Sequence, residues 1–486
     1  GGRCMASRQR DVEAALNLRT FIDRLEAAGK LKKVENAHWD LEIGALTEIE
    51  AETEERSALL FDSIADYPEG YRVLSNVLRS PESDALALGM SSDVRGMDVV
   101  QAVKGRLQDL KPIPPAEIGE SPLLENVAFD SDVNVLKFPT PRWHADDGGR
   151  YIGTFTATVC RDPDTGYINV GTYRVQVHDR DTLGVWMIPG KHGDLITRKY
   201  WARGEPCPVA VVCGLPPGLM MASAVGIPWN VSEYDFLGGL LEAPVPVIKG
   251  QKTGLPVPAF ADLVLEGTIP PPEQETHEEG PFGEWPGYYA SGSRQAPVVK
   301  VEAVYHRNDP IITGDPPLRT FLNSEAHKYI RSANIWSAME RAGIPDVRGV
   351  WFPKQGRFIV TVAVAQRYSG HAKQAGYGVL ATRDGGRDVR MVIVVDEDVD
   401  ITNMGEVLWA MSTRWDPRAD SEVLDVAASI LNPRLSPEDK QRRELTTSCM
   451  VVDACRPYSW KDDFPKVSGV SAEYKAEVRA KWADRL

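Results

Sequence analysis

The sequence predicts a multidomain α+β protein whose central domain is rich in β-strands. The chain has 486 residues, which is more than a single hydrophobic core usually organises. Short strand-like runs separated by glycine and proline crowd the middle of the chain, and strand and helix patterns alternate after them. We therefore expect an N-terminal α+β domain, a central β-domain, a C-terminal α/β domain and a terminal helix, over residues 1–130, 131–317, 318–465 and 466–486.

The N-terminal domain is expected to mix helices with short strands. Apolar residues recur at helical spacing after Asn17, a typical N-cap, so we predict a helix over residues 17–28 that ends at Gly29. Similar patterns predict helices at 41–52 and 97–110 and strands at 31–34, 58–61 and 72–74. No grouping of catalytic residue types stands out in this domain.

The central domain is expected to form a barrel or a sandwich, because its short strands recur at regular, turn-like intervals. Strands are predicted at 151–160, 169–178, 183–188, 209–212, 245–249 and 298–305. The uncharged run over 206–232 is long enough to span a bilayer, but prolines and glycines interrupt it. We therefore expect buried strands and tight loops there rather than a membrane span.

The C-terminal domain is expected to alternate strands with helices. Helices are predicted at 321–342, 371–380 and 404–412, the last capped by Thr402, and strands at 347–352, 357–364 and 391–395. The acidic run Asp396–Asp400 lacks the glycine and final glutamate of an EF-hand loop, so we interpret it as the polar end of a strand. In the terminal helix over 471–486, Tyr474, Val478 and Trp482 recur every four residues. This face docks either on a partner subunit or on its own domain.

The overall composition narrows the possible partners. A formal net charge of −14 argues against nucleic-acid binding and against an anionic membrane surface, although it does not exclude an anionic substrate. The six cysteines include no CxxC pair, so neither a structural zinc site nor a disulfide framework is expected. No signal-peptide pattern is visible, and we expect a cytoplasmic protein.

An acidic, turn-rich segment over 278–288 is the first candidate for chemistry. Glu278, Glu279 and Glu284 lie within seven positions, among glycines and prolines that disfavour regular structure. A strand would point Glu279 and Glu284 to opposite faces, and a helix would separate them by about 140°. A bent loop would bring both to one pocket. Taken alone, surface acids in a turn are the commoner interpretation.

Polar residues in the preceding strands supply a second candidate. Asn169, His192 and Glu233 offer oxygen and nitrogen ligands suited to Mg²⁺ or Mn²⁺ beside phosphate oxygens. Arg174 is a fixed cation that can bind a carboxylate through two hydrogen bonds. Glycines nearby allow a phosphate to approach the backbone. The sequence contains no GxGxxG motif between a strand and a helix and no Walker A motif, which disfavours a Rossmann or P-loop domain.

In this order the motifs resemble the UbiD family of non-oxidative decarboxylases, over nearly the whole chain. The matching segments are Asp147-Gly148-Gly149-Arg150-Tyr151, Asn169-Val170-Gly171-Thr172-Tyr173-Arg174, Ser232-Glu233-Tyr234-Asp235-Phe236 with Gly238-Gly239, Glu279-Gly280-Pro281-Phe282-Gly283-Glu284, His371-Ala372-Lys373 and Asp396–Asp400. Each motif alone is modest, but their joint order is specific.

The resemblance implies a cofactor, its ions and a fold. The cofactor is prenylated FMN, held in a central split β-barrel of the flavin-reductase type within a homodimer or larger homo-oligomer. A divalent ion, Mn²⁺ or Mg²⁺, is implied on Asn169, His192 and Glu233, and a monovalent ion, K⁺ or Na⁺, near Ala222 and Ser223. The cofactor-binding residues implied are Asn169, Gly171, Thr172, Tyr173, Arg174, Lys191, His192, Ser223, Glu233 and, through the phosphate, Lys373.

The resemblance also implies that Arg174, Glu279 and Glu284 form the catalytic network. Glu284 is expected to deliver a proton as general acid, while Glu279 and Arg174 position and tune it. The cofactor is implied as the electron sink while carbon dioxide leaves. A nearby cation lowers the pKa of a glutamate, whereas burial and a second carboxylate raise it, so such a network can keep one acid protonated and another ionised.

The implied activity is the reversible, non-oxidative decarboxylation of an aromatic or heteroaromatic acid. The expected substrate-lining segments are 318–324, where Asn323 offers a hydrogen bond, 330–336 and 409–415. The small residues Ala326, Ser332 and Ala333 would leave room for a polycyclic acid such as a phenazine carboxylate. Two alternatives stay open. One is a flavin-binding maturation or chaperone-like protein without turnover, and the other is a metal-dependent hydrolase that activates water with Asn169, His192 and Glu233.

Overall fold

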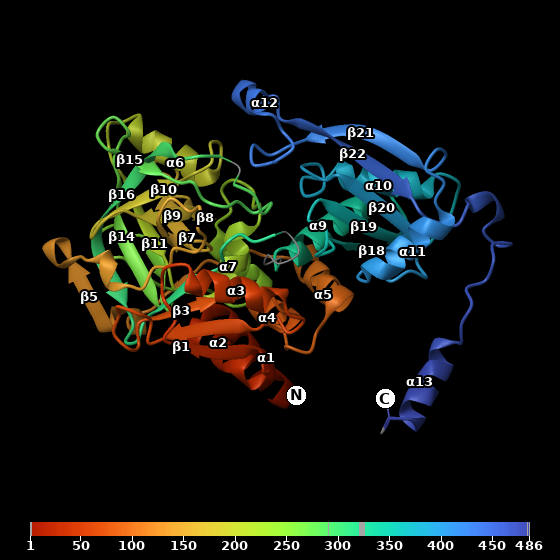
Figure 1. Ribbon diagram of the computed structural model, residues 1–486, viewed down its shortest axis with the longest axis horizontal. Coiled ribbons are helices and arrows are strands. Elements are labelled where there is room, and N and C mark those ends of the chain that lie inside the picture. The colour runs from red at the N-terminus through yellow and green to blue at the C-terminus, as the bar shows by residue number, and fades with distance from the viewer. Residues whose placement is uncertain (1, 290, 320–325, 484, 486) are drawn as a thin grey trace.

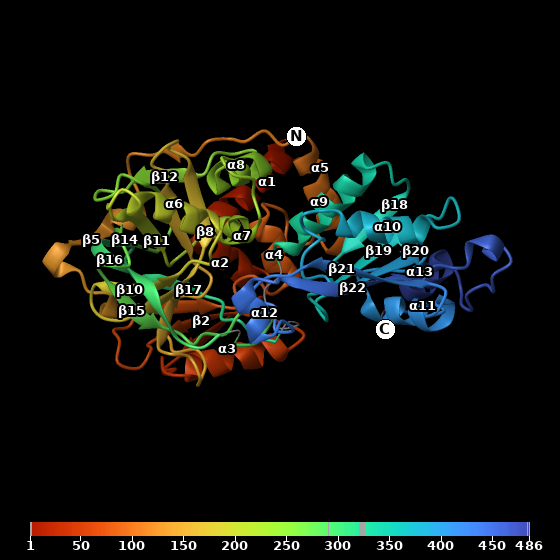
Figure 2. The ribbon, with the colours of Figure 1, turned by 90° about the horizontal axis from the view of Figure 1, so that it is seen from above.

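The structure, a computed structural model, describes residues 2–289, 291–319, 326–483 and 485. Figure 1 shows the N-terminal and central domains packed together as one lobe and the C-terminal domain as a second lobe. Helices α5 (Gly96–Gln108) and α9 (Lys328–Arg341) pack against each other where the lobes meet, and the view from above in Figure 2 shows the same arrangement. The predicted multidomain α+β class is confirmed.

The N-terminal domain packs helices on a four-stranded sheet of order β1-β2-β3-β17. Its elements are α1 (Gly2–Leu16), α2 (Leu18–Ala27), β1 (Leu31–Glu35), α3 (Glu42–Glu52), β2 (Ala58–Asp62), β3 (Arg72–Ser75) and α4 (Pro81–Ala87), with β17 (Ile311–Gly314). Asn17 caps α2 as predicted, because its side chain accepts a hydrogen bond of 3.1 Å from the Arg19 N–H. Helices α1 and α4 were not predicted. Strand β17 arrives from the central domain and pairs in parallel with β3, which joins the two domains.

The central domain is a curled sheet of ten strands, the split β-barrel that was expected. Its path runs β6-β9-β10-β16-β14-β11-β7-β8, and β5 and β15 pair with the long strand β16. The strands are β5 (Asn126–Phe129), β6 (Arg150–Gly153), β7 (Ala157–Arg161), β8 (Ile168–Thr172), β9 (Arg174–Val177), β10 (Thr182–Trp186), β11 (Cys207–Val212), β14 (Leu263–Ile269), β15 (Thr276–Glu279) and β16 (Arg294–His306). A small sheet of order β13-β12-β4 flanks it, formed by β13 (Pro256–Pro258), β12 (Pro246–Lys249) and β4 (Ala116–Glu117). The predicted runs 151–160 and 169–178 each divide into two strands.

Three helices interrupt the strands of the central domain, and the sequence patterns did not predict them. They are α6 (His192–Trp201), α7 (Pro217–Ala224) and α8 (Glu233–Leu241). Helix α7 corrects the expectation of only strands and loops over 206–232. It is buried through Ser223 and uniformly apolar, so it shows no amphipathic period, and Pro217 stands in its first turn, where a helix tolerates proline. None of the helices in the described part of the chain is both long and apolar enough to cross a membrane.

The C-terminal domain is a five-stranded sheet of order β18-β19-β20-β22-β21 covered by helices. Its elements are α9, β18 (Val347–Trp351), β19 (Ile359–Val364), α10 (His371–Leu380), β20 (Met391–Asp396), α11 (Met404–Arg414), β21 (Ser421–Ala427), α12 (Pro437–Arg442) and β22 (Thr446–Asp453). Helix α9 begins at Lys328, later than the predicted residue 321, and residues 320–325 lie outside the described part of the chain. The cap of α11 is Asn403 rather than Thr402, since the Asn403 side chain accepts from the Gly405 N–H at 3.0 Å.

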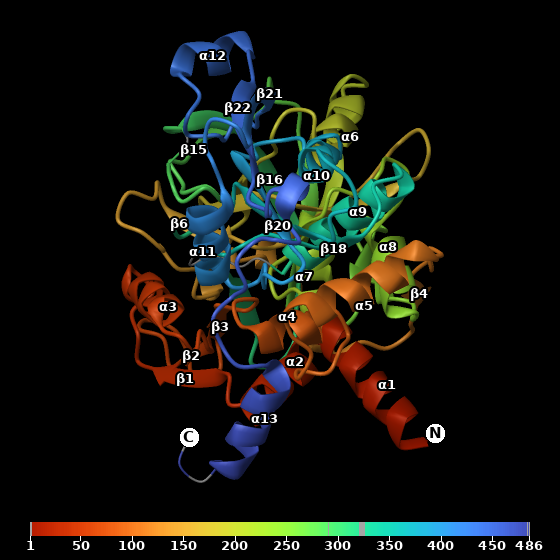
Figure 3. The ribbon, with the colours of Figure 1, turned by 90° about the vertical axis from the view of Figure 1, so that its right-hand side faces the viewer.

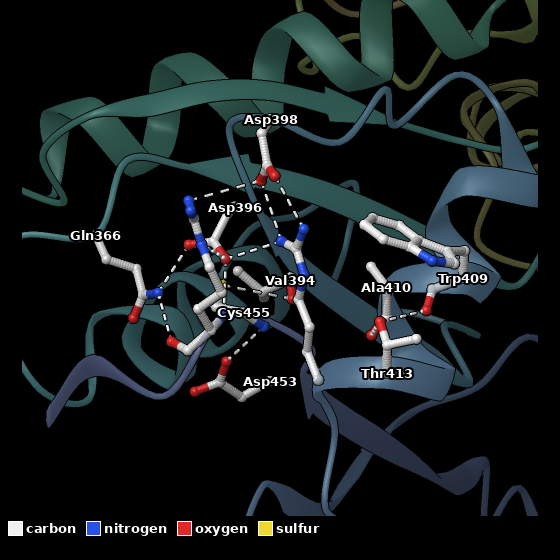
Figure 4. Close-up of polar contacts among 11 residues, drawn as sticks. Gln366, Val394, Asp396, Asp398, Trp409, Ala410, Thr413, Asp453 and Cys455 are labelled. Atoms are coloured by element: carbon white, nitrogen blue, oxygen red, sulfur yellow. Dashed lines mark hydrogen bonds and ion pairs between the residues drawn. The ribbon is translucent and has the colours of Figure 1, made fainter. Parts of the chain in front are cut away.

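The acidic run at the end of β20 is a charge-paired end of the sheet, as interpreted. Figure 4 shows Asp396 and Asp398 pointing into one cluster of polar side chains. The buried guanidinium of Arg414 donates to Asp396 at 3.0 Å and to both oxygens of Asp398 at 3.0 and 2.9 Å. Arg456 donates to Asp396 at 3.1 Å. These bonds fix the carboxyl edge of β20 to α11.

Asp398→Asn should lower the free energy of unfolding by about 1 kcal/mol. The change removes the charge from a two-bond carboxylate–guanidinium pair, but Asp398 is 36% exposed and Arg414 keeps Asp396 as a partner. Chemical denaturation at neutral pH measures the difference, and Glu397→Gln on the exposed side of the same loop is the control. A loss as large as that expected for a fully buried pair would contradict this estimate.

Helix α13 (Ala472–Lys481), the last helix of the described chain, lies apart from both lobes. Figure 1 shows it at the end of an extended segment, and it buries none of its residues. In Figure 1 and Figure 3, α1 and α13 lie on the same side of the molecule. Tyr474 is 55% and Trp482 43% exposed. Of the two predicted docking modes, packing of α13 on its own domain is not what the structure shows.

Candidate active site

Two carboxylates and one guanidinium form a buried network in the central domain. Arg174, the first residue of β9, donates from Nη1 to Glu284 at 2.6 Å and from Nη2 to Glu279 at 2.7 Å. Glu279 is fully buried and Glu284 nearly so. The glycines and prolines of 278–288 predicted no regular element here, but Glu279 is the last residue of β15, and only Glu284 lies in the bent segment that follows. Glu278 is exposed.

Neighbouring strands hold this network in place. The Tyr151 hydroxyl on β6 donates to Glu279 at 3.0 Å, and Gln176 on β9 accepts from the Gly280 N–H at 3.0 Å. A side chain at Gly148 would meet the Gly280 carbonyl oxygen at 1.9 Å, so only glycine allows the two segments to approach this closely. The motif around Gly148 therefore serves to seat the acid-bearing segment against the barrel.

Burial makes Glu284 suited to proton transfer near neutral pH. Loss of water contact raises the pKa of Glu284 to about 7, although the charge of Arg174 opposes the rise. The Glu279 carboxylate adds to the rise, because a second negative charge nearby disfavours ionisation. A carboxyl group with this pKa can exist in both protonation states at physiological pH, which is what a general acid requires.

The three predicted metal ligands gather around two tyrosines beside this network. Asn169 on β8 donates to Glu233 at 3.0 Å, and the Tyr173 hydroxyl donates to the Asn169 oxygen at 3.3 Å. The Tyr167 hydroxyl lies 3.2 Å from Nδ1 of His192. That contact occupies one ring nitrogen and leaves Nε2 to act as a ligand.

Two of the predicted metal ligands start helices that sequence patterns missed. His192 is the first residue of α6 and Glu233 the first of α8, so each lies at a helix end that attracts anions. Ser232 caps α8 by accepting from the Tyr234 N–H at 3.3 Å. Burial raises the pKa of Glu233 to about 7, against the hydrogen bond from the Val170 N–H. Burial, followed by the charges of nearby cations, lowers the pKa of His192, which favours the neutral ring that binds metals.

The oxygen and nitrogen donors fit a hard divalent ion. Asn169, His192 and Glu233 present an amide oxygen, an imidazole nitrogen and a carboxylate, the ligand types that Mg²⁺ and Mn²⁺ accept with phosphate oxygens completing the shell. Among the described residues no group of three histidine, cysteine, aspartate or glutamate side chains offers an alternative metal site. The donor set of Asn169, His192 and Glu233 therefore fits the predicted ion.

The remaining predicted cofactor residues lie around the Tyr173 ring and between β8 and α7. Gly171 and Gly193 leave room for the Tyr173 phenol, which accepts from the Gly193 N–H at 2.9 Å. The Thr172 and Ser223 hydroxyl groups lie 2.7 Å apart. Tyr173 is thus a buried support for Asn169, whereas Thr172 and Ser223 form a polar pair between β8 and α7.

A basic cluster beside His192 was missed in the sequence. Arg383 and Arg387 follow α10 in the C-terminal domain, and their charges act on Lys191 across the lobes. A side chain at Gly226 would meet Arg383 at 3.0 Å, which places that guanidinium beside α7. Lys191 keeps solvent contact, yet the protein around it and then Arg387 and Arg383 lower its pKa. Such crowding of cations indicates an anion site.

Lys373 is not brought into this cluster. Its ammonium donates to Glu422 on β21 and to the Ala419 carbonyl oxygen, both at 3.1 Å, within the C-terminal domain. Ala326, Ser332 and Ala333, expected to line the substrate site, are buried at or near α9. Asn323 lies outside the described residues.

Comparison with known proteins decides the family. Profiles described as the 3-octaprenyl-4-hydroxybenzoate carboxy-lyase N-terminal, Rift-related and C-terminal domains match residues 22–103, 116–318 and 326–454. A phenolic acid decarboxylase of Streptomyces sp. strain D7 is 32% identical and covers 97% of this chain and 98% of its own. The chain belongs to the UbiD family. It is a UbiD-family carboxy-lyase, as the motifs suggested.

Other UbiD relatives agree in sequence and structure. A pyrrole-2-carboxylic acid decarboxylase of Pseudomonas aeruginosa is 32% identical over 88% of this chain and 89% of its own. The vanillic acid decarboxylase of Sedimentibacter hydroxybenzoicus in open form has a TM-score of 0.84 at 28% identity, covering 96% and 99% of the two chains, and its closed form scores 0.77. An evolved dimeric form of the UbiD-class enzyme HmfF from Pelotomaculum thermopropionicum, in complex with prFMN, scores 0.80 at 27% identity over 97% and 100%.

Proposed function

We propose that this chain decarboxylates an aromatic or heteroaromatic carboxylic acid with prenylated FMN. The observation that carries the proposal is the buried pairing of Arg174 with Glu279 and Glu284, next to the donor set of Asn169, His192 and Glu233. A flavin-binding maturation protein would not need an acid with a pKa near 7 paired with Arg174 in a buried network. Family membership favours a carboxy-lyase over a hydrolase as well.

The chain's residues define how the cofactor would be held. Asn169, His192 and Glu233 would bind Mn²⁺ or Mg²⁺ on the cofactor phosphate, and K⁺ or Na⁺ would lie near Ala222 and Ser223. When bound, prenylated FMN supplies an electron sink for decarboxylation. His192 and Glu233 are the first residues of α6 and α8, and helix N-termini attract anions such as this phosphate.

The acid network would handle the substrate carboxylate and the proton. Arg174 would orient the substrate carboxylate through the fixed, forked geometry of its guanidinium. Glu279 keeps Arg174 in place. Glu284 returns a proton to the carbon that has lost carbon dioxide, which replaces the carboxyl group by hydrogen. Burial of the network excludes water that would otherwise supply this proton without control.

The substrate class is supported by the relatives, whose names specify phenolic acids and pyrrole-2-carboxylic acid. The test is expression with a source of prenylated FMN, followed by a visible spectrum and carbon dioxide release from a panel of one-, two- and three-ring acids that includes phenazine carboxylates. Release from at least one acid is expected. At high bicarbonate, carboxylation of the product tests reversibility. A bound flavin with no release from any acid would contradict the proposal.

The basic cluster predicts which cations hold the cofactor phosphate. Lys191→Ala and Arg383→Ala should each weaken FMN binding by about 10–100-fold, the value of a charge-assisted hydrogen bond. Lys373→Ala should change it less than about twofold, because Lys373 is paired with Glu422. Fluorescence titration of the apoprotein with FMN measures all three variants at two salt concentrations. A loss of FMN affinity confined to Lys373→Ala would instead support the phosphate-binding role of Lys373 that the His371-Ala372-Lys373 motif implied.

The assembly and location complete the proposal. We infer a cytoplasmic homodimer or larger homo-oligomer in which α13 packs on a partner subunit. The exposed Tyr474 and Trp482 support this, because an apolar helix face apart from its own lobes needs a cover. The five buried, free cysteines of the described chain suit a reducing compartment.

A further inference from the structure

A second arginine lies at the edge of the acid network. Arg294, the first residue of β16, is paired in register with Glu279 on the neighbouring strand β15. Its guanidinium carbon lies 3.9 Å from the ring centroid of Trp186, and Trp186 is in register with Arg174 across β10 and β9. Directly opposite residues of a ladder share one face of the sheet. The strands thus bring Arg294 and Arg174 to the same pair of acids.

Stacking on Trp186 fixes the Arg294 guanidinium and leaves its N–H groups able to form further hydrogen bonds. A guanidinium stacks on an indole face by charge–quadrupole attraction, which holds its plane without using its N–H groups. Arg294 donates to the Ser291 hydroxyl, while its Nε is buried without a hydrogen-bond partner. A half-buried guanidinium without a directly bonded carboxylate is costly, so its charge must be balanced at slightly longer range.

The groups able to balance it are those of the catalytic network. The charged and titratable groups acting on Arg294 are Arg174, Glu279, Glu284 and Tyr151. Those acting on Glu284 are Arg174, Glu279 and Arg294. With Arg294 included, two guanidinium groups face two carboxyl groups. Without it, the single cation Arg174 would face both acids, and ionisation of the second acid would leave a net negative charge in a buried site.

We propose that Arg294, held on the ring of Trp186, is a positioning residue that balances the charge of Glu279 and Glu284 and so sets the acidity of Glu284. Glu284 remains the proton donor, and Arg294 acts through it. The proposal rests on the function proposed above for its consequence in turnover, but the effect on Glu284 is a property of the apoprotein.

An infrared pH titration of the apoprotein tests the effect directly. The band of the protonated Glu284 carboxyl group is assigned by its loss in Glu284→Gln. Arg294→Met keeps a long apolar side chain against Trp186 but removes the charge, and should shift the band's midpoint to higher pH. Arg294→Lys should shift it less, and Lys300→Met, on the same strand, should leave it unchanged. Thermal unfolding confirms that the variants fold, and Trp186→Leu provides a second route to the same upward shift.

The loaded enzyme separates charge balance from substrate binding. In Arg294→Met the alkaline limb of the pH profile of kcat should move to higher pH, by the same shift as the infrared midpoint. At pH values below both midpoints, KM should change less than twofold. An unchanged or lowered midpoint in Arg294→Met would overturn the proposal. A raised KM at every pH, with kcat unmoved, would instead make Arg294 a substrate-binding residue and overturn it as well. A shifted midpoint without decarboxylation of any acid would refute the proposed function and leave the role of Arg294 standing.

Discussion

Glu284→Gln should lower kcat by at least about 10²–10⁴-fold while the protein still binds its flavin, because the amide keeps the shape and loses the transferable proton. Glu284 is hydrogen-bonded to Arg174, whereas Asn169 and Glu233 are hydrogen-bonded to each other, so cofactor affinity should not change. Carbon dioxide release measures kcat, and the visible spectrum measures bound flavin. Glu278→Gln, on the exposed neighbour, is the matched control and should retain full activity. A fully active Glu284→Gln enzyme would remove the general acid from the scheme.

The same substitution predicts how stability depends on pH. The pKa of Glu284 is raised to about 7 in the folded protein, so folding favours the protonated form. Below the ordinary pKa of glutamate, Glu284 is protonated in both the folded and the unfolded chain. Between that pH and about pH 7, only the folded chain keeps the proton. Stability therefore falls as pH rises through this window. Denaturation at pH 5 and pH 8 should show this loss in the native protein and a smaller loss in Glu284→Gln.

The proximity of the predicted site residues was easier to predict from the sequence than the elements that hold them. Glu279, Glu284 and Arg174 were expected to meet, and they do, because their motif context leaves few alternative roles. Asn169 and Glu233 likewise lie together. The helices that start at His192 and Glu233 were missed for different reasons. Helix α8 is short, mostly buried and contains two glycines, so it lacks the amphipathic period on which sequence reasoning depends. Helix α6 buries Asp194 while it exposes Leu195, so its buried face does not follow its apolar residues.

The basic cluster shows a different limit. Arg383 and Arg387 lie about 190 residues after Lys191 in the chain and are exposed in a loop, where arginine is ordinary. Only the folding of one lobe against the other brings their charges to Lys191. Lys373 has a motif but the structure turns its ammonium to Glu422. A short motif fixes an element such as α10, whereas the direction of a long side chain on it is set by its neighbours in space.

Arg174→Met should cost about 3–5 kcal/mol of stability in addition to activity, the loss typical when one partner of a buried ion pair is removed. Its side chain is 6% exposed and is the hydrogen-bonded cation of both Glu279 and Glu284. Without it, the two carboxyl groups share a largely buried site with less positive charge, which favours the uptake of a proton by one of them. Chemical denaturation of the apoprotein at pH 8 measures the cost, where protonation is least favourable.

The double variant Arg174→Met with Glu279→Gln separates charge from packing. If the loss in Arg174→Met comes from uncompensated carboxylates, removing the charge of Glu279 should restore part of the stability, so the two changes should not be additive. Arg174→Lys should fall between, because a lysine carries the charge but cannot reach two carboxylates with separate, fixed N–H groups. Neither the double variant nor Arg174→Lys should restore turnover, since both remove the Arg174 guanidinium that donates to Glu284 at 2.6 Å. Additive losses in the double variant would mean that Arg174 supports this site through packing alone, and the electrostatic account of the network would then be wrong.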